Sequence, residues 1–187
     1  MIKNLKLLYG AYGGWSSFFA SPYPYVSSVL TCASWNSLQD GSWASVTSSI
    51  MPSITGFSIA SFAIIISVSD ERSRRALMIK RRGDYSPLVK LSSSVSHAVI
   101  VQTVSLLFSA FFQNAKIIDL HNSDYPCILN FLFYLFSTIG IFFLFYGLLL
   151  VVAEILSIFK FLTILSNIED RLVKKQNTHS NPQDTAS

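Results

Sequence analysis

Charged residues are scarce in this sequence of 187 residues: Asp, Glu, Lys and Arg make up 13% of it, against about 25% in an ordinary soluble domain. So few charges cannot cover the surface of a water-soluble globule, and the 15 phenylalanines exclude a disordered chain. The two cysteines are too few for a zinc cluster or a disulfide framework. The composition therefore predicts an all-α, polytopic membrane protein of about four spanning helices with short loops.

Long apolar runs are what the sequence does contain. A helix that crosses a membrane needs about 20 mostly apolar residues, because each residue adds about 1.5 Å and the hydrocarbon layer is about 30 Å thick. The runs that meet this requirement without any Asp, Glu, Lys or Arg are 46–69, 95–113 and 127–153. We expect each of these three runs to be a transmembrane helix.

A fourth candidate span, 15–35, is less regular. Trp15 and Trp35 bound it, as an aromatic belt at the two membrane surfaces would, but Pro22 and Pro24 interrupt its middle. We therefore expect a kinked or partly re-entrant segment. No cleaved signal peptide is expected, because glycines interrupt the stretch that would serve as its hydrophobic region.

The distribution of basic residues predicts which loops face the cytoplasm, because Lys and Arg accumulate there. Every Lys and Arg except Lys116 lies before residue 15, within the segment 70–91 or after residue 153. Four spans with both termini in the cytoplasm satisfy this distribution. The same count makes the loop between the second and third spans the most basic part of the chain.

The helices are expected to extend into the cytoplasm. Segment 70–91 predicts a helical hairpin, in which Gly83 ends one helix and Ser86-Pro87 begin the next. The last helix is expected to continue to about residue 175, because apolar residues keep helical spacing there, and a disordered tail follows at 176–187. Residues 1–175 are thus predicted to form a single transmembrane domain.

One face of the run 46–69 carries only small residues, spaced three or four apart. They are Ser49, Ser53, Gly56, Ala60, Ala63 and Ser67. Small residues let membrane helices approach closely, which is how such helices associate without a hydrophobic driving force. The stripe predicts a close helix contact, and two interpretations are open: packing within the chain, or an interface between protomers of a homo-oligomer.

Gly140, Gly147 and Glu154 recur every seven residues, which places two points of close approach and one carboxylate on a single stripe. A charge at membrane depth costs about 2.5–3.5 kcal/mol even on lenient scales. Glu154 is therefore a candidate for gating or for bonding between protomers. The alternative is an interfacial acid close to Lys160.

The run 95–113 carries a polar stripe, with His97 near its cytoplasmic end. The stripe consists of Ser94, Ala98, Gln102, Ser105, Ser109 and Gln113. Such a row, with Gln102 at its centre, either lines a water-filled path or makes hydrogen bonds between helices.

The basic hairpin offers a surface for binding. Arg72, Arg75 and Arg82 are spaced so that they share one side of a helix, where they would hold anionic lipid headgroups or dock an acidic cytosolic partner. No nucleic-acid-binding module accompanies the charge, so direct nucleic-acid binding is not expected. The sequence contains no glycine-rich phosphate loop and no Cys/His cluster, so we expect a non-enzyme without metal, cofactor or small-molecule substrate.

The residues 56–71 (GFSIASFAIIISVSDE), the basic helix after them, Tyr85-Ser86-Pro87-Leu88-Val89 and the polar third span resemble small four-pass proteins of bacterial anti-phage defence loci. Among these the chain is most similar to the family of Kiwa membrane subunits (KwaA), over about half of its length. The resemblance implies a homo-oligomer of the inner membrane that senses phage attack and works with a cytosolic DNA-binding partner, KwaB. It carries over no catalytic residue. A pore-forming or channel-like effector and an immunity protein against a pore-forming bacteriocin are the alternative functions.

Overall fold

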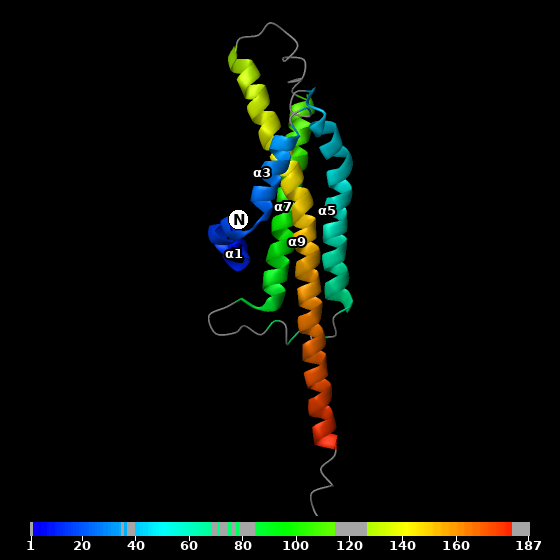
Figure 1. The fold of residues 1–187 in the computed structure, drawn as a ribbon. Helices are drawn as coiled ribbons and strands as arrows, with labels where there is room; N and C mark the ends of the chain where they lie inside the picture. Colours follow the sequence, from blue (N-terminus) through cyan, green and yellow to red (C-terminus); the bar gives the residue numbers. More distant parts are fainter. Residues whose placement is uncertain are drawn as a thin grey trace, which may run out of the picture.

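A computed structural model describes most of the chain, and every element in the described part is an α-helix, as the composition predicts. The described residues are 2–34, 36, 40–68, 71, 75, 78, 85–114 and 127–180. The elements are α1 (Ile2–Tyr12), α2 (Gly14–Ala20), α3 (Tyr23–Ala33), α5 (Trp43–Val68), α7 (Pro87–Asn114) and α9 (Cys127–Ser180), which are arranged as Figure 1 shows.

Three of the described helices are long and apolar enough to cross a membrane. The spanning stretches are Trp43–Ser67 in α5, Pro87–Asn114 in α7 and Asn130–Ile168 in α9. They contain most of each of the three uncharged runs of the sequence, so the prediction that these runs form long apolar helices is confirmed. α7 begins where the Ser86-Pro87 pair predicts, and the Ser86 hydroxyl accepts a hydrogen bond from the Val89 N–H at 3.4 Å.

The segment 15–35 does not form one continuous helix. It is divided between α2 and α3, and the break falls at Ser21, whose extended backbone (φ −77°, ψ 141°) is the conformation that a following proline favours. Pro22 precedes α3 and Pro24 lies in its first turn, where a missing N–H costs no helical hydrogen bond. The prolines therefore divide the segment into two helices, neither of which is long enough by itself to cross a membrane.

α9 is the longest element, and its 54 residues extend for about 80 Å. Its C-terminal part projects beyond the ends of α5 and α7 (Figure 1). The helix continues to Ser180, past the end expected near residue 175, and residues 181–187 of the expected tail lie outside the described part. Most residues of the hairpin 70–91, including Gly83, also lie outside it.

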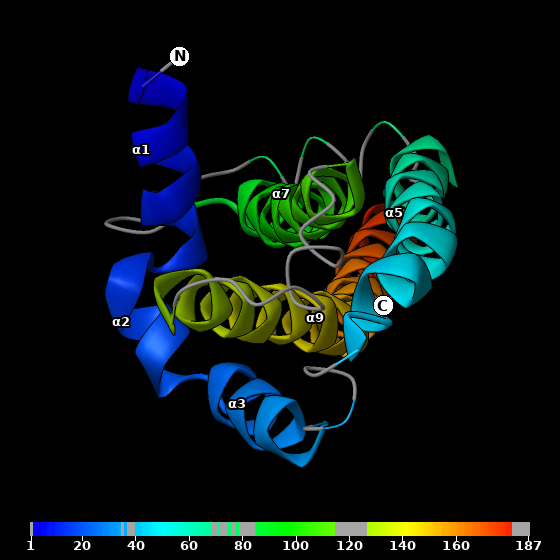
Figure 2. The same cartoon turned by 90° about the horizontal axis from the view of Figure 1, so that it is seen from above.

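α5, α7 and α9 pack against one another, and α3 covers the other side of α9 (Figure 2). α5 runs parallel to α9 and antiparallel to α7, because residues early in α5 meet early residues of α9 and late residues of α7. α1 packs on α7. The N-terminal helices therefore wrap the bundle on the side away from α5.

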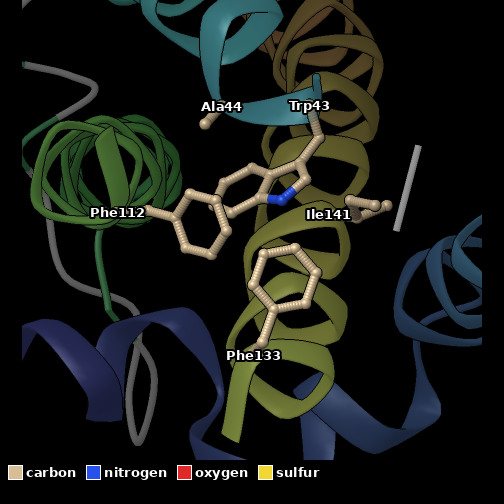
Figure 3. Close-up of a cluster of buried hydrophobic side chains, with 5 residues drawn as sticks. All are labelled: Trp43, Ala44, Phe112, Phe133 and Ile141. Atoms are coloured by element: carbon tan, nitrogen blue, oxygen red, sulfur yellow. The ribbon is translucent and has the colours of Figure 1, made fainter. Parts of the chain in front are cut away.

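Two apolar clusters hold the ends of the three-helix bundle together. The first, which we call the Trp43 cluster, consists of Trp43, Ala44, Phe112, Phe133 and Ile141 (Figure 3). The second, which we call the Phe161 cluster, consists of Ile65, Leu91, Val95 and Phe161. The two clusters are about 30 Å apart along α5, the thickness of a hydrocarbon layer.

Candidate functional site

The stripe of Gly140, Gly147 and Glu154 is the surface with which α9 contacts α5. A Cβ added to Gly140 would overlap the indole ring of Trp43, and one added to Gly147 would lie 3.1 Å from Cε of Met51. Two turns further on, the hydroxyl of Ser58 donates a 2.6 Å hydrogen bond to Oε2 of Glu154. The two glycines therefore act within the chain, where they make room for large side chains of α5.

The stripe of small residues on α5 faces away from the bundle. All six of its members, from Ser49 to Ser67, are exposed, and a Cβ added to Gly56 would meet no atom within 4 Å. α5 buries the opposite face, including Trp43, Met51 and Ser58. The contact of this stripe within the chain is therefore not formed: the close approach of α5 and α9 uses glycines of α9, and α5 contributes large side chains. The interface between protomers stays a prediction.

Glu154 lies deep inside the spanning layer. Its partner Ser58 is about 22 Å along α5 from Trp43 and about 14 Å from Ser67, the two ends of the span. Burial and the bond from Ser58 therefore favour a role of Glu154 inside the bundle, while its interpretation as an interfacial acid beside Lys160 stays a prediction. The apolar stretch of α9 is longer than a bilayer is thick, so composition alone does not fix which part lies beside the apolar stretch of α5, whereas the contact with Ser58 does.

Buried polar side chains continue from Glu154 through the interior of the bundle toward the Trp43 cluster. We call these residues the polar layer: Ser58 and Glu154, which are in contact, then Gln102, whose Cγ lies beside the position of a Cβ on Gly147, and Ser105, about one turn further along α7, all of them at most 2% exposed. Among the described residues, neither amide atom of Gln102, nor Oγ of Ser105, nor Oε1 of Glu154 has a hydrogen-bond partner. A layer of buried and unpaired polar atoms in the middle of a membrane protein is unusual, because such groups are costly there.

The two apolar clusters enclose the polar layer. Along the buried face of α5, Ala44 belongs to the Trp43 cluster, Met51 and Ser58 follow, and Ile65 belongs to the Phe161 cluster. Large side chains therefore separate the layer from both ends of the bundle. This arrangement describes a closed polar site rather than an open pore.

The polar stripe of α7 has two functions along its length. Near the Trp43 end, Ser109 and Gln113 donate hydrogen bonds of 2.6 and 2.8 Å to the Ala44 carbonyl, and both contact the Ser48 hydroxyl. This half bonds α7 to α5, as one of the two interpretations of the stripe expects. Gln102 and Ser105 make no such bonds in the described part of the chain, so this half of the stripe consists of buried polar atoms without a partner.

A second polar cluster, missed by the sequence reasoning, attaches the N-terminal helix to the bundle. Nε2 of His97 lies 3.2 Å from the Tyr146 hydroxyl, and the Tyr12 ring packs on the His97 ring at 4.4 Å. The Tyr12 and Tyr146 hydroxyls are also hydrogen-bonded, and burial raises the pKa of Tyr12, so its hydroxyl remains neutral. Tyr9 and Tyr12, one turn apart in α1, were the available signal for a helix with one packed face.

The attachment of α1 yields a prediction. The Ser93 hydroxyl donates a 2.6 Å hydrogen bond to the Leu8 carbonyl, and the net value of such a bond is about 1 kcal/mol. In Ser93→Ala, hydrogen–deuterium exchange of the α1 amides should therefore become about fivefold faster. Ser96→Ala, on the same helix, is the control, and equal exchange in the two variants would contradict the attachment.

The basic hairpin is described only in part. Arg72 and Arg82 lie outside the described residues, and Arg75 is exposed and forms an ion pair with Glu71 one turn earlier. Within the described residues, no group of three or more His, Cys, Asp or Glu side chains comes together to hold a metal ion. The polar layer is therefore the most distinctive candidate site. Comparison of the chain with protein-family models, with curated proteins and with solved structures finds no match in any of the three.

Proposed function

We propose that this chain is a non-enzymatic component of the bacterial inner membrane that works by assembling with other protein chains, first of all with copies of itself. The observation that carries this proposal is the exposed small-residue stripe of α5. Only 11% of the spanning window of α5 is buried within the chain, against 44% for α7. α5 therefore has the largest free surface among the three spanning helices, and its free face is the one that suits close helix packing.

The geometry of α5 favours a second copy of the chain as the occupant of this face. Gly56 offers open space, and the bulky side chains of Phe57, Ile59 and Ile64 stand exposed around the stripe. Two such faces are complementary to each other when they meet about a twofold axis, because the large side chains of one helix pass beside the small residues of the other.

A four-span arrangement is part of the proposal. α1 lies beside the N-terminal end of α7, where Gly10 approaches Tyr85 and Ser93 bonds Leu8. α3 then leads to the start of α5, at the opposite end of the bundle. In the proposed arrangement α2 and α3 together form a broken first crossing and both termini face the cytoplasm; the distribution of Lys and Arg supports this orientation.

The cytoplasmic surface is the proposed contact for a soluble partner. The part of α9 beyond the bundle lies at the end where α5 finishes and α7 begins, and the segment 70–91, which connects these two helices in the sequence, is rich in Lys and Arg. Anionic lipid headgroups and an acidic face of a partner both suit that charge. The resemblance to Kiwa membrane subunits specifies the proposal further, as a sensor of phage attack with a DNA-binding partner of the KwaB kind.

A channel-like effector is the second candidate, and the polar layer favours it. Polar groups at the middle of a membrane helix often line a path for water or ions. The Trp43 and Phe161 clusters would have to separate before such a path reached both membrane surfaces.

Assembly through α5 is tested by the double substitution Gly56→Leu with Ala60→Leu. Both positions are exposed, so the single chain should fold as before, while the added side chains block the approach of a second α5. We expect the association constant to fall by at least about tenfold, which corresponds to about 1.4 kcal/mol. Analytical ultracentrifugation in mild detergent measures this change. Thr103→Leu, on the exposed face of α7, is the control; complexes of native size in the double variant would show that the stripe faces lipid.

A further inference from the structure

The polar layer leaves several hydrogen bonds unmade. Among the described residues, the Gln102 amide has unpaired donors and an unpaired acceptor, and the Ser105 hydroxyl and Oε1 of Glu154 are unpaired as well. Each such group destabilises the bundle when it is buried without a partner. In a membrane helix bundle the alternative of bonding to bulk water does not exist. A ligand that satisfies these atoms therefore stabilises the bundle strongly.

The mixture of donors and acceptors identifies the ligand. A cation would bind Oε1 of Glu154 but would leave the N–H groups of Gln102 unpaired. Water both donates and accepts, and buried waters typically make about three hydrogen bonds to groups of this kind. Water is therefore the chemical class that fits the layer.

The directions of the side chains bring Gln102 and Glu154 together. Side chains on a helix lean toward its N-terminus, and α7 and α9 are antiparallel. Gln102, whose Cγ lies 3.6 Å from the position of a Cβ on Gly147, therefore leans along the bundle toward Glu154, and Glu154 leans toward Gly147. The unpaired amide and the unpaired carboxyl oxygen thus face the same section of the interior.

The charges around Glu154 decide its chemistry. α5 contains no titratable side chain, α3 contains two tyrosines and Cys32, and α7 contains His97 and Lys90. His97 is bonded to Tyr146, and Lys90 lies in the first turn of α7, beyond Leu91 of the Phe161 cluster. In the described part of the chain, the one hydrogen bond that Glu154 makes comes from a neutral hydroxyl. A permanently charged carboxylate is disfavoured in such surroundings.

We propose that the polar layer is a water-holding pocket near the middle of the membrane, in which the carboxyl group of Glu154 binds and releases a proton. In the protonated state, Ser58 donates to Oε2 and the proton resides on Oε1, which donates to water. On release, the O–H bond at Oε1 breaks and the proton joins the water as hydronium, which leaves a carboxylate that accepts from Ser58 and from water. This site lies on the opposite face of α5 from the assembly stripe, so the proposal does not depend on the proposed oligomer.

Infrared spectroscopy of the full chain in dodecyl maltoside tests the proposal, because this detergent has no ester carbonyl whose stretching band would overlap that of a carboxylic acid. A protonated carboxylic acid has its own C=O stretching band, and we expect such a band in the wild-type chain and its loss in Glu154→Gln. Asp40→Asn removes an exposed carboxyl outside the spanning stretches and should leave the band unchanged. The band should disappear as the pH is raised, return as it is lowered, and shift to lower wavenumber in D2O.

The outcomes separate the two parts of the proposal. A band that is identical in wild type and Glu154→Gln, or that no pH change alters, overturns proton binding by Glu154. A band that is insensitive to D2O overturns the water-holding pocket. Gln102→Leu should retain the band but slow its exchange in D2O, because it removes a water ligand. If Glu154→Gln does not fold, which circular dichroism reveals, a wild-type band that persists at a pH where exposed carboxyl groups are ionised answers the question, and the absence of a band at that pH overturns the proposal.

Discussion

Replacing Gly140 by alanine is expected to lower the free energy of unfolding by about 1–3 kcal/mol, the usual cost of forcing an additional methyl group into a packed interior. The new Cβ would overlap the Trp43 indole, which is only 2% exposed. Phe112, Phe133 and Ile141 surround the ring, so it has no free space into which it can move (Figure 3). Either the ring leaves its rotamer or α5 separates from α9.

The measurement is unfolding of the purified chain in detergent, followed by the helical circular dichroism signal. Gly56→Ala is the matched control, because the same methyl group meets no atom within 4 Å there. Alanine is the better helix former by about 1 kcal/mol, so the control should be as stable as the wild type or more stable. Equal destabilisation by both substitutions would show that glycine flexibility, and not the contact with Trp43, is what the helices require.

Truncation of Phe112 is expected to cost about 3 kcal/mol, at the low end of the range for buried Phe→Ala substitutions. Phe112 is 1% exposed and packs on Trp43 and Phe133, with ring centroids 4.9 and 5.6 Å apart. In a lipid environment the transfer of apolar surface contributes little, because lipid is as apolar as the protein interior. The loss of packing contacts and the cavity left behind account for the cost.

Phe111→Ala is the control for this substitution. Phe111 is the neighbouring residue on the same helix and is 58% exposed. Its substitution by alanine removes the same number of atoms as that of Phe112. Its truncation should leave the unfolding midpoint within error of the wild type. If the two variants unfold alike, the Trp43 cluster is not what holds α5, α7 and α9 together at this end.

The spanning helices could be predicted because their signal is compositional. A run of about 20 residues without a charge has no stable position in water, whatever its neighbours are. The first residue of a helix could also be predicted from the sequence where a capping residue fixes it, as Ser86 does for α7. The division of 15–35 into α2 and α3 follows from Pro22, although the sequence did not show that the two helices would stay on one side of α9.

The face with which α5 packs against α9 could not be predicted from the sequence, because two helices can approach closely when only one of them carries a small residue at the contact. Gly140 and Gly147 supply it on α9, so α5 uses Trp43 and Met51 at the contact and leaves Gly56 outside. Small residues mark where a helix permits contact; the partner's shape decides whether contact occurs.

The depth of Glu154 within the bundle also could not be predicted from the sequence. The apolar stretch Asn130–Ile168 exceeds the thickness of a bilayer, and many positions along it satisfy the hydropathy pattern equally. The register is fixed by pairwise fit: Gly140 with Trp43, Gly147 with Met51 and Glu154 with Ser58. Such fit is a property of the two helices together and cannot be predicted from the sequence of either helix alone.

The uninterrupted course of α9 has a mechanical consequence. Beyond Gly147, as far as Ser180, the helix contains neither glycine nor proline, so no residue weakens its hydrogen-bonded backbone over about 50 Å. Its contacts with α5 recur every seven residues along one line. A twist applied to the free end therefore turns Gly147 and Glu154 together, and the same rotation that loosens Glu154 from Ser58 also moves Gly147 away from Met51.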